Sequence, residues 1–562
     1  MSERQREVDD FRRAQGEREN HLIDEYSAGR ISRREFVRRG SIMGLSIPVV
    51  GWLAAACGGS DEPSGTGATT TAPEGKAGGT FKFGLTTPSS GLDPVTVADA
   101  GGLCLNGQTG EYLSYSLGKP ELVPRIAESW EANDDATVWT FTIRQGVTFN
   151  DEASTPLTTA DVAATFNRLA DPKNKSNSLS VFQGILNGGG VSAPDETTVV
   201  FELEAPNGSW PFLVSSDNYN AIMLPENYDG DWEKTWIGTG PWKLDSYTPK
   251  VGASLVRNEK YWGEKALPDR VEITFYDDAA AAVLLLQGKQ VDALDATNIA
   301  NGRAIINDTD NFTIIRINGS THRELSMRCD QEPFKDNRVR QAIALTLDRQ
   351  GIIDGLFEGY SDLGNDSPFA PVFAATNKDV PQREKDIEQA KQLMADAGVP
   401  NGFSVQMNAI KTGEVPQYAQ IVQNSAKEIG VDIKLLIQDP TTYYGDAVFG
   451  KSPWLDSVMS LVDYGHRGVP NVLLGAPLLS DGVWNAAHFK NPEYDGLVND
   501  FYAEPDIGRQ QEIAGNIQTL LLEETPIIFA YFYNILTPTL KNVSGVVPTA
   551  INHLFVDRAT KA

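Results

Sequence analysis

Residues 122–162 read LVPRIAESWEANDDATVWTFTIRQGVTFNDEASTPLTTADV, and this stretch decides the fold. Apolar and polar residues alternate over 138–144, which predicts a strand, and Gly146 then turns the chain into a second short strand at 147–149. Thr158 or Thr159 can cap a following helix, whose N-terminal dipole Asp161 favours. Strands and helices therefore mix within one region.

The same mixture continues toward the C-terminus. Residues 336–348 place Val339, Ile343 and Leu347 at a spacing of four, which predicts a helix with one apolar face. A second helix is expected over 386–397, closed by the glycine and proline at 398 and 400. No repeat period emerges, so the predicted class is mixed α/β.

Length and charge limit the classes of function. A chain of 562 residues with 41% apolar composition can fill the cores of two or three lobes. The formal net charge of -27 argues against nucleic acid as a partner, because neutralising phosphates requires clustered Lys and Arg.

The N-terminal residues have the order of an export signal. Residues 30–39, RISRREFVRR, carry five arginines and one acid, and a nearly charge-free run over 40–56 ends in LAAAC at 53–57. A permanent membrane helix is the alternative interpretation, but a run of about 17 residues is at the lower limit for spanning a bilayer and this one contains three glycines and a proline. Residues 58–77, rich in Gly, Ser, Thr and Pro, predict a flexible linker.

Two short motifs make this signal more specific. SRREFVR at 32–38 resembles the twin-arginine export motif, with Arg33, Arg34 and Phe36 in the matching positions. AAAC at 54–57 resembles a lipobox, which implies cleavage before Cys57 and lipid attachment to its thiol. Ala54 departs from the leucine that lipoboxes prefer there. The resemblance implies residues 1–57 as the signal and a body anchored by lipid to the outer face of the cytoplasmic membrane.

The sequence patterns that resemble catalytic or cofactor-binding motifs lack the surrounding residues that such motifs require. GDAVFGKS at 445–452 satisfies the phosphate-loop pattern, but no strand-like run feeds it directly and Pro453 follows it. The turn GTGP at 238–241 is interrupted by its proline. Neither a Gly-x-Ser-x-Gly nor a His-Glu-x-x-His motif occurs, and the five histidines never share metal-ligand spacing within one helix. We expect no catalytic residue, no metal and no cofactor.

The stretch at 122–162 resembles the signature region of the family 5 extracellular solute-binding proteins, the peptide and nickel class. Four later blocks resemble that family in its own order. They are IGTGPW (237–242), VRN through YWG (256–263), PFKDNRVRQA with DR (333–349), and WN with NPEYD (484–495). The turn after Phe149 is slightly longer here than in the family, which affects the local loop and not the fold.

The resemblance implies a periplasmic-binding-protein-like clamp of two lobes with an extra inserted subdomain, the cluster C type. Hinge motion would close the lobes over the ligand. The implied division is lobe I at 78–118, 236–325 and 534–562, the inserted subdomain at 119–235, and lobe II at 326–533. Cys104 and Cys329 could pair outside the cytoplasm, although two buried free thiols are the expectation.

A binding cleft for a peptide needs an anion for its ammonium and a cation for its carboxylate. Residues 461–470, LVDYGHRGVP, resemble the region in which oligopeptide-binding members place an Asp-Tyr pair. Asp463 and Tyr464 match that pair, with Asp463 on the ammonium, although an exposed loop acid is an equally good interpretation. Arg467 is the candidate for the carboxylate and His466 for a nickel chelate. Candidate aromatic lining is supplied by Trp454, Tyr443 and Tyr464, and core packing explains any single aromatic equally well.

The sequence thus predicts a monomeric lipoprotein that binds a small solute, most specifically a short peptide, for the permease subunits of an ABC importer. Nickel chelate, an oligosaccharide or another small metabolite remain alternative ligands. A lipoprotein hydrolase on the same scaffold is a further alternative, which the missing nucleophile and metal motifs disfavour.

Overall fold

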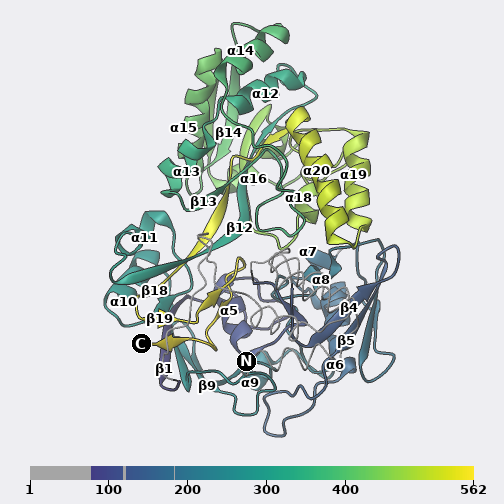
Figure 1. Cartoon of the computed structure of the whole chain (residues 1–562), viewed down its shortest axis with the longest axis vertical. Coiled ribbons are helices and arrows are strands. Elements are labelled where there is room, and N and C mark those ends of the chain that lie inside the picture. The colour runs from purple at the N-terminus through teal and green to yellow at the C-terminus, as the bar shows by residue number, and fades with distance from the viewer. Residues whose placement is uncertain (1–76, 118–121, 183) are drawn as a thin grey trace, which may run out of the picture. The chain divides into compact units, whose positions relative to one another are not determined.

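The structure is a computed structural model that describes residues 77–117, 122–182 and 184–562. These residues belong to one compact unit, Ala72–Ala562 (Figure 1). The predicted export and lipidation residues Arg33, Arg34, Phe36 and Cys57 lie outside the described residues. Within the described ranges, no helix combines the length and the apolar character that a membrane crossing requires.

The unit contains two large apolar cores. The first is built from residues between Phe81 and Phe312 and again between Leu540 and Ala559. The second is built from residues between Leu325 and Phe532. We call the parts of the chain around them the first lobe and the second lobe. The exact limits predicted for lobe I, the inserted subdomain and lobe II stay predictions.

One mixed sheet of twelve strands runs through both cores. Its path is β15 (Asp432–Gln438), β14 (Ser404–Ile410), β16 (Met459–Tyr464), β12 (Phe312–Met327), β18 (Tyr531–Leu540), β11 (Ala293–Leu294), β1 (Thr80–Thr86), β10 (Arg270–Tyr276), β9 (Gly252–Arg257) and β8 (Trp242–Thr248), with β13 (Ser361–Leu363) on β18 and β17 (Ile527–Ile528) on β12.

The antiparallel strands β12 and β18 connect the two lobes (Figure 1). Phe312 at the start of β12 packs in the first core, whereas Leu325 and Met327 near its end pack in the second. Between Asn318 and His322 the register of the pair shifts. Such a bulge bends a strand and redirects its side chains, and here it lies between the segments of β12 that enter each core.

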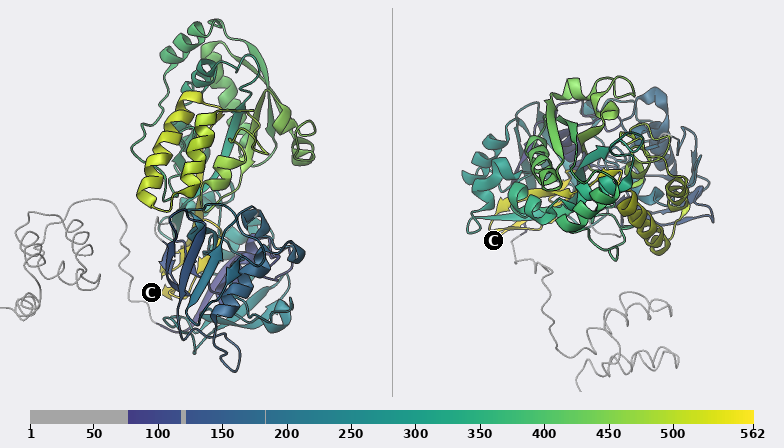
Figure 2. Two further views of the ribbon diagram at one scale, coloured as in Figure 1. Left: turned by 90° about the vertical axis from the view of Figure 1, so that its right-hand side faces the viewer. Right: turned by 90° about the horizontal axis from the view of Figure 1, so that it is seen from above.

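Helices cover the sheet in both lobes. Those of eight or more residues are α5 (Ala100–Thr109), α6 (Thr159–Ala170), α10 (Ala279–Gln287), α11 (Ile299–Ile306), α12 (Asn337–Leu345), α13 (Arg349–Phe357), α14 (Ile387–Asp396), α15 (Val415–Ala426), α19 (Pro492–Ala503) and α20 (Ile507–Glu524). Shorter ones are α7 (Leu179–Phe182), α8 (Trp210–Leu213), α9 (Trp232–Thr235), α16 (Pro440–Tyr444), α17 (Pro453–Asp456) and α18 (Asn471–Gly475). In the second lobe α19 and α20 lie side by side (Figures 1 and 2).

The stretch at 122–162 supplies two strands of a separate four-stranded sheet. Its order is β4 (Ala127–Ala132), β5 (Val138–Ile143), β7 (Thr198–Glu202) and β6 (Val191–Ser192). β5 confirms the predicted strand. Helix α6 begins as predicted, with Thr158 as its N-cap and Asp161 completing a reciprocal capping box. Three pairs of two-residue strands complete the described strands: β2 (Ser114–Tyr115) with β3 (Val123–Pro124), β19 (Val543–Ser544) with β22 (Thr560–Lys561), and β20 (Val547–Pro548) with β21 (Leu554–Phe555).

Two predicted elements differ from the structure. The strand expected at 147–149 is wrong: only an isolated bridge joins Thr148 to Pro156. The amides of Phe149 and Leu157 donate across the bridge, but the Thr155 amide donates to the Asp151 carboxylate within the turn, so the pairing goes no further on that side. The helix expected over 336–348 stops at Leu345, because Asp348 caps a new helix, α13. The helix at 386–397 is confirmed as α14, with Asp386 as its N-cap.

The two described cysteines are free thiols. Cys104 is fully buried in the first core, and Cys329 is partly buried against the second. Burial raises the pKa of both thiols, which makes them poor nucleophiles.

Candidate functional site

A cavity of about 350 Å³ lies where segments of both lobes meet. The first lobe contributes residues from 177–185 and 212–220 together with Ile551, and the second lobe contributes residues from 466–472 together with Trp484. Ligand pockets in proteins range from about 300 to 1,000 Å³ and combine apolar walls with a few polar groups. This cavity is therefore at the small end of that range.

The loop after β16 brings two predicted residues, His466 and Arg467, into this cavity. Ser320, in the bulge of β12, holds the loop in place. Its amide donates to Nδ1 of His466 at 3.0 Å, and its hydroxyl accepts from the Arg467 amide at 2.8 Å. The position of both side chains thus depends on the strand that joins the lobes.

Arg467 is the cation of this cavity. Its Nη1 donates to the carbonyl of His466 at 2.9 Å. Among the residues that the structure describes, no carboxylate forms an ion pair with it. A guanidinium with unused donors in a cavity is suited to bind a carboxylate in two parallel hydrogen bonds.

His466 is a neutral imidazole. Burial lowers its pKa to about 3, and the neighbouring Arg467 charge contributes in the same direction. Because Nδ1 accepts from the Ser320 amide, the ring proton resides on Nε2. In this state the ring offers a donor, not a free metal-ligating nitrogen, to the cavity. Among the described residues, no group of three or more His, Cys, Asp or Glu side chains is arranged to hold a metal ion.

Asp463 and Tyr464 do not line this cavity. Asp463 is half-buried and accepts a hydrogen bond from the Tyr444 hydroxyl. It also lies opposite Arg323 in the antiparallel pair of β16 and β12. The Tyr464 ring is buried, stacked on His322 with centroids 5.5 Å apart and planes 7° apart. The predicted contact of Asp463 with an ammonium stays a prediction.

The other two predicted aromatics are core residues in this structure. Tyr443 is fully buried, and its hydroxyl donates to the carbonyl of Leu461 at 2.9 Å. Trp454, in α17, is only 4% exposed. Both pack in the second core, and neither lines this cavity. The rings at the cavity are Phe212, Tyr219 and Trp484.

Asp217, which was not among the predicted site residues, lines the cavity from the first lobe. It also lines a small neighbouring cavity together with Ser116 and His466. Burial raises the pKa of Asp217 to about 6, against a smaller lowering by the Ser116 hydroxyl. An acid within the polar run SSDNYN at 215–220 has the sequence pattern of an exposed loop, so no local signal distinguishes it.

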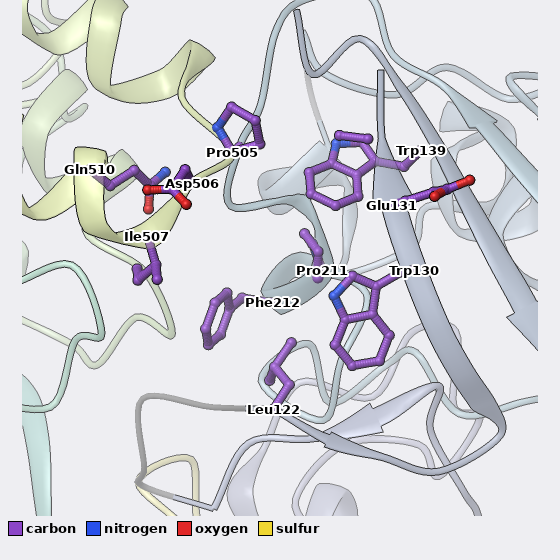
Figure 3. A pocket seen from close by; sticks show the side chains of 12 residues that line it. Leu122, Trp130, Glu131, Trp139, Pro211, Phe212, Pro505, Asp506, Ile507 and Gln510 are labelled. Atoms are coloured by element: carbon purple, nitrogen blue, oxygen red, sulfur yellow. The ribbon is translucent and has the colours of Figure 1, made fainter. Parts of the chain in front are cut away.

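A second, more open groove of about 470 Å³ lies between the four-stranded sheet and the start of α20. Figure 3 shows its apolar side chains facing one another, among them Trp130, Phe212 and Ile507. None of the predicted ligand-binding residues lines it. Beside it the amide of Gly208 donates to the carbonyl of Tyr502 at 2.7 Å, which joins the two lobes.

The phosphate-loop pattern at 445–452 lacks the required architecture. The short helix α16, and not a strand, leads into it, and α17 begins only at Pro453, after the pattern has ended. Backbone N–H groups therefore do not converge on a phosphate in the way that such a loop requires.

Comparison with known proteins identifies the relatives of this chain. The family described as bacterial extracellular solute-binding proteins, family 5 Middle, matches residues 121–459. A heme-binding protein A of Haemophilus influenzae is 24% identical over 86% of this chain and 92% of its own length. A dipeptide-binding protein of Escherichia coli is 23% identical over 77% of this chain and 85% of its own.

Solved structures share the fold. HbpA2 from Haemophilus parasuis matches with a TM-score of 0.76 at 22% identity, covering 86% of this chain and all of that one. The unliganded open form of the murein tripeptide-binding protein MppA matches with a TM-score of 0.76 at 21% identity, covering 87% of this chain and 99% of that one. The predicted fold class, a mixed α/β clamp of two lobes, is confirmed.

Proposed function

The chain belongs to the bacterial extracellular solute-binding proteins of family 5, and from that premise we propose that it captures a short peptide between its lobes and delivers it to an ABC importer. The observation that carries the proposal is Arg467. It is a cation without an ion-pair partner among the described residues, in a cavity that both lobes line. Relatives named as dipeptide-binding and di/tripeptide-binding proteins support the choice of peptide.

The mechanism requires binding without chemistry. A peptide that contacts both lobes stabilises the form in which they are closed, and the importer's permease subunits recognise that form. The Arg467 guanidinium would hold the terminal carboxylate of the peptide. Cavity walls such as Phe212 and Trp484 would cover its side chains, with water filling the remaining space.

The N-terminal motifs extend the proposal to location. Arg33, Arg34 and Phe36 would direct twin-arginine export, and a lipid on Cys57 would anchor the monomeric body to the outer face of the cytoplasmic membrane. The 58–77 linker would give the anchored body freedom to reach the permease.

Isothermal titration with dipeptides and tripeptides tests the ligand class. We expect saturable binding that weakens about 10- to 100-fold in Arg467→Gln, because a hydrogen bond to a charged group contributes about 1.5–3 kcal/mol. A peptide with an amidated C-terminus is the matched ligand, and its affinity should be the same for both proteins. No response to peptides, together with binding of nickel-histidine, heme or an oligosaccharide, would replace the peptide by that ligand.

A further inference from the structure

Asp217 is a carboxylate in the cavity with no cation to neutralise it. No Lys, Arg or His of the described residues lies within ion-pair distance of it. Its own amide donates to the Ser215 hydroxyl at 3.1 Å, which fixes the backbone of the segment that presents it. Asp217 is half-buried. A carboxylate partly withdrawn from water is stabilised by a compensating partner, and the cavity is the side from which one can arrive.

Asp463 already has polar partners within the protein. Its carboxylate already accepts from the Tyr444 hydroxyl, and the Arg323 guanidinium belongs to the residue opposite it on β12. Arg323 in turn contacts Glu414, with its Nε 3.0 Å from Oε1. Asp463 therefore takes part in a network that the protein itself completes.

Asp217 and Arg467 together give the cavity two opposite charges, one from each lobe, and they form no ion pair with each other. We propose that Asp217 binds the ammonium group of a zwitterionic ligand whose carboxylate is held by Arg467, so that the charges of the ligand bridge the two lobes. This inference rests on the proposed function and makes Asp217, in place of Asp463, the residue that selects ligands with a free amino group.

The geometry beside Asp217 fits this role. A Cβ built on Gly468 would lie 2.5 Å from Oδ2 of Asp217, so the loop that carries Arg467 passes directly beside the carboxylate. The Gly468 backbone therefore packs against this side of the Asp217 side chain, and any added side chain would clash with it. The cavity of about 350 Å³ limits the ligand to a small zwitterion of dipeptide size.

At neutral pH the carboxylate is ionised. Its pKa, raised to about 6 by burial, is still below 7. His466, which lines the same two cavities, stays uncharged because its pKa is lowered to about 3. The net charge next to an incoming ammonium on the first-lobe side is therefore negative.

The test compares Asp217→Asn with Asp463→Asn in the full chain, by titration with alanyl-alanine and with N-acetyl-alanyl-alanine at pH 7.5. We expect wild type to prefer the free amine, Asp217→Asn to lose about 10- to 100-fold for the free amine alone, and Asp463→Asn to keep the preference. Both substitutions preserve shape, and circular dichroism with a thermal melt confirms that each variant is folded.

The possible results of this test distinguish the proposed peptide-binding function from the assignment of Asp217 to the ammonium group. A wild-type chain that binds no peptide overturns the proposed function and this assignment with it. Peptide binding that is unchanged in Asp217→Asn overturns the assignment alone, as does a selective loss in Asp463→Asn. If Asp217→Asn does not fold, Asp217→Glu, which keeps the charge, must retain a preference for the free amine, and its loss counts against the assignment.

Discussion

The hydroxyl of Ser320 joins both backbone polar groups of Arg467: it accepts from the amide at 2.8 Å and contacts the carbonyl at 2.9 Å. Ser320 is fully buried within the bulge of β12, the strand that passes from one core to the other. The loop that carries the proposed carboxylate-binding side chain is thus fixed to a strand shared by both lobes.

Ser320→Ala should reduce both stability and affinity. Removing the hydroxyl leaves the Arg467 amide and carbonyl without this partner, at a cost of about 1–3 kcal/mol in the free energy of unfolding. Affinity for peptides should fall because Arg467 is no longer held in position. Urea denaturation and calorimetric titration measure the two effects.

The matched control is Ser544→Ala. The Ser544 hydroxyl pairs with the side chain of Thr560 at 2.9 Å, in the first lobe between β19 and β22. Its removal should leave affinity unchanged. Unaltered affinity in Ser320→Ala as well would contradict the positioning role of Ser320.

Asp366→Asn should destabilise the second lobe strongly without altering the ligand class. Asp366 is fully buried and forms ion pairs with Arg349 and Arg383, both at 2.7 Å. Removing the charge leaves two largely buried guanidinium groups without their carboxylate, and breaking a buried pair in this way costs about 3–5 kcal/mol. Asparagine tolerates the positive φ of 50° at this position, so the backbone does not add to the loss.

Asp432→Asn is the comparison for that experiment. Its ion pair with Lys434 is exposed, and such pairs contribute about 0–1 kcal/mol. If urea denaturation gives equal losses in the free energy of unfolding for the two variants, the buried carboxylate of Asp366 does not stabilise the fold more than an exposed one.

The sequence predicted the elements whose signals are local. Thr158 or Thr159 was predicted to cap α6 and Asp161 to favour its dipole, and the structure shows a capping box of Thr158 and Asp161. The helix predicted over 386–397 is α14, with Asp386 as its N-cap. The helix over 336–348 was predicted too long because a capping aspartate, Asp348, falls within its apolar period. Capping and periodicity are properties of neighbouring residues, so they can be recognised without the fold.

The site was predicted only in part. His466 and Arg467 were identified because they follow an Asp-Tyr motif in the chain, and both line the cavity. Asp217 belongs to a segment about 250 residues earlier, and nothing in the residues around it reveals the loop that it faces. Tyr443 and Trp454 show the opposite case, because a buried core aromatic and a cavity aromatic look alike in sequence.

The pH dependence of binding should follow the titration of Asp217. Because its folded pKa of about 6 exceeds its ordinary value of 3.8, its ionisation destabilises the ligand-free fold. This contribution to stability is complete below pH 4 and is lost as the pH rises through 6. Affinity for a ligand with an ammonium group should change in the opposite direction and increase from pH 4.5 to 7.

Asp217→Asn is the control for that titration. The histidines of this region, His466 and the buried His553, have pKa values lowered to about 3 and about 4. The difference between wild type and Asp217→Asn, in thermal melts and in titrations, isolates the Asp217 carboxylate. Identical pH profiles for the two proteins would contradict its role.

Export and anchoring should fail separately when their residues are changed. Replacing Arg33 and Arg34 by lysine keeps the positive charge but removes the arginine pair, so the full-length precursor should accumulate inside the cell. Cys57→Ser removes the thiol that receives the lipid, so the protein should lose its radiolabelled acyl chains and keep its uncleaved signal. Replacing Arg38 and Arg39 by lysine, outside the pair, is the control and should permit export. If the wild-type protein incorporates no radiolabelled acyl chains and retains residues 40–56, the lipoprotein assignment is wrong.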